Sequence, residues 1–369
     1  MKRIYLDHNA TTPLSAAAAK AMSDWCMPGT IANASSVHAE GRAARHAVSL
    51  AREQVAQSIR ARPKDIVFTS GATEANHMAL GGRTGPIVVS AIEHPSIAVH
   101  GEQEHTRIAQ VDQFGRVDHH HLNEQLVGAS LCSIMLANNE VGTVQNIEPI
   151  SNLCHQAGAL LHIDGSQALG RIPIDVESLG ADLLTISAHK AYGPPGVGAL
   201  WIRPGLDWPT FIPGGHQERG RRAGTENVLG IVGFGAAAAT VPVLVERFQS
   251  LISLREELAE GCSRFWNTHR FSPLKNCLPN TLTLGFPPCD GETILMSLDL
   301  QGVSVSTGSA CSAGSLDPSP VLLAMGHTAE TARTAVRFSL GVDTSTDDIS
   351  SVLDILERVV PSAAKELEW

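Results

Sequence analysis

The chain has few aromatic residues, no long apolar run and no excess of positive charge. Phenylalanine, tryptophan and tyrosine make up 4% of the 369 residues, and the formal net charge is −10. The acidic balance argues against a general nucleic-acid surface or a surface for acidic membranes. No apolar stretch is long enough to span a bilayer. Composition therefore favours small-molecule chemistry.

Recognisable cysteine pairs, a signal peptide and a nucleotide-phosphate motif are also missing. The seven cysteines show no CxxC spacing, and the start, MKRIYLDHNATTPLS, turns acidic and polar too soon for a signal-peptide core. These absences predict a cytoplasmic protein with reduced thiols, of which one or more is available for chemistry. Without GxxxxGK[ST], a bound phosphate need not belong to a nucleotide.

Short apolar runs alternate with helical or loop segments in the first half of the chain. The runs are Asp65–Thr69, Pro86–Ser90, Ser130–Leu136, Ala159–Asp164, Ala181–Ser187 and Val197–Ile202. Near-continuous apolar strands joined by crossovers predict an α/β fold with a mostly parallel sheet, covered on both faces. A short helix opened by proline over Pro13–Met27 and an amphipathic helix over Gly41–Ala61 are expected to precede it.

The pattern changes at about Leu229, where long helical stretches begin. Short strands at TLTLGF, VSVS and TAVRFSL follow, and a last helix is expected to end near Val360. This indicates a large domain over 15–245 and a smaller α+β domain made of 1–14 and 246–369. The run His119–His121 predicts a solvated loop, with adventitious metal binding as the alternative.

Polar residues follow three of the expected strands. Ser70–Thr73 opens a helix, where free N–H groups and hydroxyls would hold a phosphate, although an ordinary serine or threonine cap explains the pattern equally well. Asp164 ends the run Ala159–Asp164, at the carboxyl end of a strand, where open α/β sheets bind ligands. A plain helix cap is again the alternative. Lys190 follows the run Ala181–Ser187, and a lysine that simply reaches solvent is the default interpretation.

The three strand ends would together bring phosphate donors, a carboxylate and an amine to one place. Pyridoxal phosphate needs all three: a lysine for its aldehyde, an acidic partner for its pyridine nitrogen and a cradle for its phosphate. Lys190 would then be a covalent ligand. Cys311 lies in SVSTGSACSAGSLDPS, a stretch of small and polar residues, which favours an exposed functional thiol over a structural one.

Ordered motifs along nearly the whole chain resemble those of one enzyme family. The motifs are YLDHNATTPL, NASSVHAEGRAAR, FTSGATEANH, IEHPSI, NNEVGTVQ, HIDGSQALGRIPID, SAHKAYGPPGVGAL, RAGTEN, STGSACSAGSLDPS and VRFSLG. They are similar to those of the cysteine desulfurases of the NifS and IscS type, which are fold-type I pyridoxal phosphate enzymes of aminotransferase class V. The resemblance implies a seven-stranded, mostly parallel sheet in the large domain. It also implies a mobile catalytic-cysteine loop at about 306–318 in the small domain.

The resemblance also assigns roles to individual residues. Lys190 would hold the cofactor and move the substrate α-proton, Cys311 would carry a persulfide, and His94 would stack over the pyridine ring and shuttle protons. Asp164 would bind the pyridine nitrogen and Gln167 the ring hydroxyl. The other implied cofactor contacts are Ala72, Thr73, Asn139, Ser187, His189 and Thr225, the last from a neighbouring subunit, and the implied contacts to the substrate carboxylate are Arg337 and Asn33.

The implied reaction removes sulfur from L-cysteine, gives L-alanine and leaves a persulfide on Cys311. The sulfur would pass to an acceptor protein, such as an iron–sulfur scaffold or a component of another sulfur-transfer pathway. A homodimer is implied, and neither a nucleic acid nor a membrane is expected as a partner. No resident metal is expected, and Cys311 would be at most a transient iron–sulfur ligand. A selenocysteine lyase or an aminotransferase on the same fold stays an alternative, as does a non-catalytic sulfur-relay scaffold.

Overall fold

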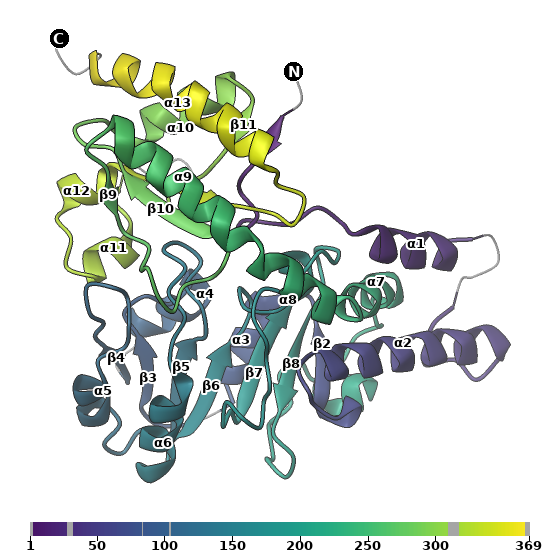
Figure 1. The fold of residues 1–369 in the computed structure, drawn as a ribbon. Coiled ribbons are helices and arrows are strands. Elements are labelled where there is room, and N and C mark those ends of the chain that lie inside the picture. Colours follow the sequence, from purple (N-terminus) through teal and green to yellow (C-terminus); the bar gives the residue numbers. More distant parts are fainter. Residues whose placement is uncertain (1–2, 28–31, 83, 103–104, 309–316, 366–369) are drawn as a thin grey trace.

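A seven-stranded sheet forms the lower half of the molecule in Figure 1, a computed structural model that describes residues 3–27, 32–82, 84–102, 105–308 and 317–365. Its strands are β2 (Ile66–Thr69), β3 (Ile87–Ser90), β4 (Thr106–Ala109), β5 (Leu131–Met135), β6 (Leu160–Asp164), β7 (Leu183–Ser187) and β8 (Gly198–Ile202), in the spatial order β2-β8-β7-β6-β5-β3-β4. All neighbours pair in parallel except β8, which is antiparallel to both β2 and β7. The predicted mostly parallel sheet is confirmed.

Both faces of this sheet are buried, which explains the continuous apolar runs. In β2, Phe68 packs into the core that contains residues of α2 (Ala39–Ser58), α6 (Ile147–Gln156) and α7 (Val228–Ala238), whereas Val67 faces the core formed with α3 (Ala72–Leu80). Successive strand side chains point to opposite faces, so a strand that is covered on both sides carries apolar residues on both. The buried Ser133, His162 and Thr185 are exceptions, and they are hydrogen-bonded to one another.

A second group of elements lies in the upper half of Figure 1, where both chain ends are found. Antiparallel strands β9 (His269–Arg270), β10 (Thr281–Gly285) and β12 (Ala335–Ser339) form one sheet, and β1 (Ile4–Tyr5) pairs with β11 (Val303–Ser304). Leu6 shares an apolar cluster with α9 (Leu251–Phe265), α10 (Gly291–Leu300) and α13 (Thr346–Lys365). This cluster is the second core, and a smaller cluster, in which Ile92 and Met135 pack with Phe271, joins the two groups of elements. The boundaries at residues 15 and 245 stay a prediction.

Two helix predictions near the surface were wrong in detail. The helix α1 spans Ala16–Trp25 and is capped by the Ser15 hydroxyl, which accepts from the Ala18 N–H, so Pro13 does not open it. The three histidines begin α5 (His119–Gln125) instead of forming a loop. The Asp118 carboxylate accepts from the N–H groups at positions 120 and 121, and this cap stabilises the helix start.

Burial accounts for two further differences from the prediction. The strand β4 was not anticipated, because an edge strand pairs only with β3 and carries the mixed sequence TRIA instead of an apolar run. The last helix, α13, continues past Val360 and contains Pro361. Ala363 is buried in the second core, so packing of the apolar face outweighs the backbone hydrogen bond that the proline cannot donate.

The remaining helices connect these parts. They are α4 (Pro95–Ala98), α8 (Val241–Gln249), α11 (Pro320–Ala324) and α12 (Ala329–Arg333), with 3-10 turns at Pro63–Asp65, Val99–Glu102, Ala188–Lys190 and Gln217–Gly220. No single helix in the described ranges is long and apolar enough to cross a membrane, and only the bent pair Val228–Ala238 and Val241–Phe265 passes that test of length and composition jointly.

Candidate active site

The carboxyl ends of several strands meet at one edge of the large sheet. Because β8 lies between β2 and β7, Gly198 pairs with both Thr69 and Ser187. The carboxyl ends of β2 and β7 therefore lie on either side of the start of β8. A cavity of about 320 Å³ opens at this edge. Ten of the predicted site residues line it: Ala72, Thr73, His94, Asn139, Asp164, Gln167, Ser187, His189, Lys190 and Arg337.

Lys190 is half-buried in the 3-10 turn that directly follows β7. Its Nζ donates to the backbone carbonyls of Asn9 and Ala10, the second at 2.8 Å. Contacts on both sides hold this N-terminal segment in place. Asp7 forms an isolated β-bridge with Ser339 of β12, and the Thr12 N–H donates to the carbonyl of His189 at 2.9 Å. The lysine is therefore directed into the cavity by two backbone acceptors, and the solvent-facing interpretation is wrong.

Asp164 is buried at the end of β6 and accepts hydrogen bonds at both carboxylate oxygens. Its Oδ1 accepts from the Ser166 N–H at 2.9 Å, and its Oδ2 accepts from Asn76 Nδ2 at 2.9 Å. The local bond to Ser166 is what a plain turn cap would make. The bond from α3 has no such local explanation, and it fixes the carboxylate against the wall of the cavity.

The start of α3 forms another wall and is not capped by a side chain. Gly71 is the N-cap residue and no side-chain oxygen accepts from the first turn, so the serine or threonine cap is excluded for this helix. Glu74 instead accepts from the Ser70 N–H at 2.8 Å and pairs with Arg222 through two hydrogen bonds. The N–H groups at positions 72 and 73 therefore border the cavity at the positive end of a helix, an arrangement that suits an anion.

The approach of β8 to this helix start depends on the absence of a side chain at Gly198. A Cβ at this position would lie 2.7 Å from the backbone carbon of Gly71 and 2.9 Å from the Ile186 oxygen. We expect Gly198→Ala to lower the free energy of unfolding by about 1 to 3 kcal/mol, as overpacking does elsewhere, in a denaturant titration. Gly101→Ala is the control, because its Cβ would meet only Ile108 Cδ1 at 3.7 Å. An equal loss in both variants would contradict the close-approach argument.

Buried polar atoms without a partner gather at this cavity. Of eleven such side-chain atoms in the described residues, five belong to residues that line it: Asn76 Oδ1, Ser166 Oγ, Gln167 Oε1, Ser187 Oγ and Arg337 Nε. Buried polar groups are normally hydrogen-bonded, since an unpaired one costs about 1 to 3 kcal/mol. The cavity is thus prepared for a polar ligand that offers both donors and acceptors.

His94 lies four residues after the end of β3 and is the N-cap residue of α4. Its Nδ1 accepts from the Ser96 N–H at 3.1 Å and lies 2.9 Å from the Ser96 hydroxyl. Burial lowers the pKa of His94 below its ordinary value, an effect that the charge of Asp164 opposes and that of Lys190 reinforces. The imidazole is therefore neutral at physiological pH.

Arg337 reaches the cavity from β12, in the second core, and is 1% exposed. It pairs with Asp7 Oδ1 at 2.6 Å and donates to the carbonyls of Gly308 and Asn139 at 2.6 and 3.1 Å. These three bonds use three of its five N–H donors, and Nε remains buried without a partner. The site therefore lies between the seven-stranded sheet and the three-stranded sheet, and β12 of the three-stranded sheet supplies a cation.

Two predicted site residues do not line this cavity, and a third is not among the described residues. Thr225 lines a neighbouring cavity of about 240 Å³ that shares Gly196 and Val197 with the first. Asn33 precedes α2, where its Oδ1 accepts from the Ser35 N–H, and it does not line the cavity in this chain. Cys311 lies outside the described residues. The roles of these residues stay predictions.

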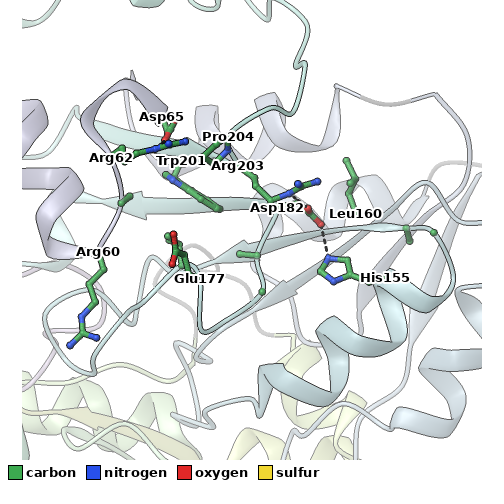
Figure 2. A pocket seen from close by; sticks show the side chains of 16 residues that line it. Arg60, Arg62, Asp65, His155, Leu160, Glu177, Asp182, Trp201, Arg203 and Pro204 are labelled. Atoms are coloured by element: carbon green, nitrogen blue, oxygen red, sulfur yellow. Dashed lines mark hydrogen bonds and ion pairs between the residues drawn. The ribbon is translucent and has the colours of Figure 1, made fainter.

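A larger cavity, of about 640 Å³, opens at the opposite edge of the sheet and is shown in Figure 2. Its arginines are already paired with carboxylates: Arg203 contacts Asp182, Arg62 contacts Asp65 and Arg60 contacts Asp175. His155 Nε2 also lies 3.1 Å from Asp182. No buried side-chain polar atom among its described lining residues lacks a hydrogen-bond partner. The balanced charges and satisfied polar groups make it a weaker candidate than the smaller cavity.

Comparison with known proteins agrees with this geometry. The aminotransferase class-V family model matches residues 4–352. A cysteine desulfurase IscS of Dictyoglomus turgidum is 41% identical over 98% of this chain and 95% of that protein. The solved structure of a NifS-like protein from Rickettsia africae has a TM-score of 0.90 at 34% identity, and the match covers 97% of this chain and 99% of that protein. The structure of SspA in complex with cysteine has a TM-score of 0.79 at 30% identity, and the match covers 93% of this chain and 100% of that protein. The chain therefore belongs to the aminotransferase class-V family and, within it, to the cysteine desulfurases of the NifS and IscS type.

Proposed function

We propose that this protein is a pyridoxal phosphate-dependent cysteine desulfurase that transfers sulfur from L-cysteine to its own Cys311. The observation that carries the proposal is the cavity in which Lys190, Asp164 and the uncapped start of α3 lie together. An amine, a carboxylate and an anion cradle are the groups that this cofactor requires from a protein. The relatives named cysteine desulfurase support cysteine as the substrate.

The polar atoms of the cavity fit the cofactor group by group. The Asp164 carboxylate is an acceptor for a protonated pyridine nitrogen. Gln167 donates through Nε2 to the Asn9 carbonyl, which leaves the buried Oε1 to accept from the ring hydroxyl. Ser187 Oγ and the start of α3 would receive the phosphate, together with Thr73 and His189. When bound, the cofactor supplies an electron sink for the charge that develops at the substrate α-carbon.

The residues of the chain then perform the remaining tasks. Lys190 Nζ would hold the cofactor and would also move the proton at the substrate α-carbon, from a position set by the carbonyls of Asn9 and Ala10. Arg337 would bind the substrate carboxylate with its spare N–H donors, assisted by Asn33. The neutral imidazole of His94 would face the ring and would exchange a proton with the substrate thiol.

Cys311 accepts the sulfur, a role that rests on the sequence. The described cysteines are poor alternatives, because burial raises the pKa of Cys262 to about 12 and that of Cys277 to about 11. Cys26 is exposed but does not line the cavity. In the net reaction the Cβ–S bond of cysteine breaks and an S–S bond forms at Cys311, giving alanine and a persulfide without an external oxidant or reductant.

The partners follow from the same family likeness. A homodimer would bring Thr225 of one subunit to the site of the other, and a sulfur-acceptor protein, such as an iron–sulfur scaffold, would take the persulfide sulfur. The acidic net charge of −10 supports a protein that binds neither nucleic acid nor acidic membranes. A cytoplasmic location is part of the same proposal.

Alanine formation tests this function directly. The purified protein is incubated with cysteine and a reductant, and alanine is quantified for the wild type, for Cys311→Ser and for Cys26→Ser as the exposed-thiol control. We expect the wild type and the control to form alanine and Cys311→Ser to fall to the blank, because serine cannot accept sulfur.

Other outcomes would point to the alternative functions. Cysteine consumption by Cys311→Ser at the wild-type rate, without formation of alanine in either, would favour an aminotransferase, which needs no thiol. A faster rate with selenocysteine than with cysteine, measured side by side, would indicate a selenocysteine lyase. A colourless protein that cannot be reconstituted with pyridoxal phosphate would favour a non-catalytic scaffold.

A further inference from the structure

A chain of hydrogen bonds joins Asp164 to His94 through two side chains with no role assigned so far. Asn76, on α3, donates from Nδ2 to Asp164 Oδ2 and to Ser96 Oγ, both at 2.9 Å. Ser96 Oγ in turn lies 2.9 Å from His94 Nδ1. Asn76 and Ser96 are 1% and 7% exposed, so water does not compete freely for these bonds.

The direction of each bond follows from chemistry. An ionised Asp164 only accepts, so the NH₂ group of Asn76 must face it, and the second hydrogen of that group then points at Ser96. Because the Ser96 oxygen accepts from Asn76, its own hydrogen is available for His94 Nδ1. The Ser96 N–H is a donor to the same nitrogen. Two donors directed at Nδ1 leave the ring proton of a neutral imidazole on Nε2.

Capping of α4 explains only part of this arrangement. His94 is the N-cap residue, and acceptance from the Ser96 N–H is the usual bond of such a cap. The Ser96 hydroxyl and the Asn76 amide are not needed for a cap. Their bonds connect the imidazole to a carboxylate 70 residues further along the chain.

We propose that Asn76 and Ser96 are positioning residues that form a relay from Asp164 to His94 and hold the imidazole with its proton on Nε2. The inference deepens the proposed function, since it defines the protonation state of the histidine that faces the substrate. In this arrangement the ionised carboxylate orders the amide, the amide orders the hydroxyl, and the hydroxyl selects the tautomer.

The charged groups around His94 come from three elements. Asp164 on β6 favours the imidazolium form, and Lys190 after β7 disfavours it. Glu93 precedes His94 in the chain, but its Oε1 accepts from Ser90 Oγ and the Met135 N–H, away from the relay, and burial raises the pKa of Glu93 to about 8. Loss of a donor to Nδ1 removes a bond to the neutral form, so the pKa of His94 should rise toward its ordinary value.

Nitrogen NMR of histidine-labelled protein tests the relay without measuring turnover. The sample is the full-length protein without added cofactor, and the His94 resonances among the 16 histidines are assigned by their loss in His94→Gln. We expect the wild type to show an unprotonated Nδ1 and a protonated Nε2. Ser96→Ala should raise the pKa of His94 by about 0.5 to 1 and populate the other tautomer, whereas Ser96→Thr, which keeps the hydroxyl, should restore the wild-type spectrum.

Asn76→Ala is the decisive variant, because Asn76 does not hydrogen-bond to His94. We expect it to raise the pKa of His94 in the same direction as Ser96→Ala, and we expect no further rise when it is combined with Ser96→Ala, as for two members of one chain. Ser166→Ala, which removes another hydroxyl beside Asp164, should leave the tautomer of His94 unchanged.

Two results would overturn the proposal. A His94 that keeps its pKa and tautomer in Asn76→Ala would show that the relay does not extend to Asp164, and an unchanged His94 in Ser96→Ala would show that the backbone cap suffices. If Asn76→Ala does not fold, the Ser96→Ala and Ser96→Thr pair still decides the tautomer. Failure of the proposed function would appear separately, as a protein with the expected tautomer that forms no alanine.

Discussion

Replacing Lys190 with alanine is expected to lower the rate of alanine formation from cysteine by at least about 10³-fold, because in the proposed site this one side chain would supply both the covalent link and the proton transfer. The yellow colour expected of the bound cofactor should disappear as well. Borohydride reduction of the wild type, followed by peptide mass spectrometry, should place the cofactor on Lys190. The variant should carry none, because no other lysine among the described residues lines the cavity.

Lys64→Ala is the matched control for this experiment, since Lys64 is exposed in the turn Pro63–Asp65. It should keep the colour and the rate of the wild type. Labelling at Lys64, or a Lys190→Ala variant that retains the wild-type rate, would contradict the proposed site. Thermal unfolding of both variants should be compared, because the carbonyls of Asn9 and Ala10 lose a donor in Lys190→Ala.

The sequence predicts the sheet and its functional edge well, for a physical reason. Strands that are buried on both faces carry apolar residues at most positions, which makes β2, β3 and β5 to β8 visible as runs. In a mostly parallel sheet the residues that follow such runs must meet at one edge. Asp164 and Lys190 therefore could be placed together from the order of motifs alone.

Contacts made by residues outside the strand ends could not be predicted. The acceptors for Lys190 come from a segment about 180 residues earlier, and they are backbone carbonyls, which leave no trace in the choice of side chain. Asn76 and Ser96 occupy helix positions where a polar residue is unremarkable by pattern. Only the packing of α3 against the sheet and against α4 shows that they connect Asp164 with His94.

Arg337 presents a conflict between stability and binding that a pair of variants can separate. Its guanidinium is buried and already paired with Asp7, so Arg337→Met leaves a half-buried carboxylate unpaired and should lower the free energy of unfolding by about 3 kcal/mol. The same change would remove the cation proposed to bind the substrate carboxylate and should therefore raise KM for cysteine by about 10- to 100-fold. Denaturant titration and steady-state kinetics measure the two effects separately.

The double variant Asp7→Asn/Arg337→Met assigns these losses to their causes. Without the charge at Asp7 there is no unpaired carboxylate, so we expect most of the lost stability to return, because the penalty of a broken buried pair comes mainly from the partner left behind. The raised KM should persist, because neither asparagine nor methionine supplies a cation. Recovery of both stability and KM would mean that Arg337 only supports the fold, and the carboxylate of cysteine would then have to be bound by another residue of the cavity.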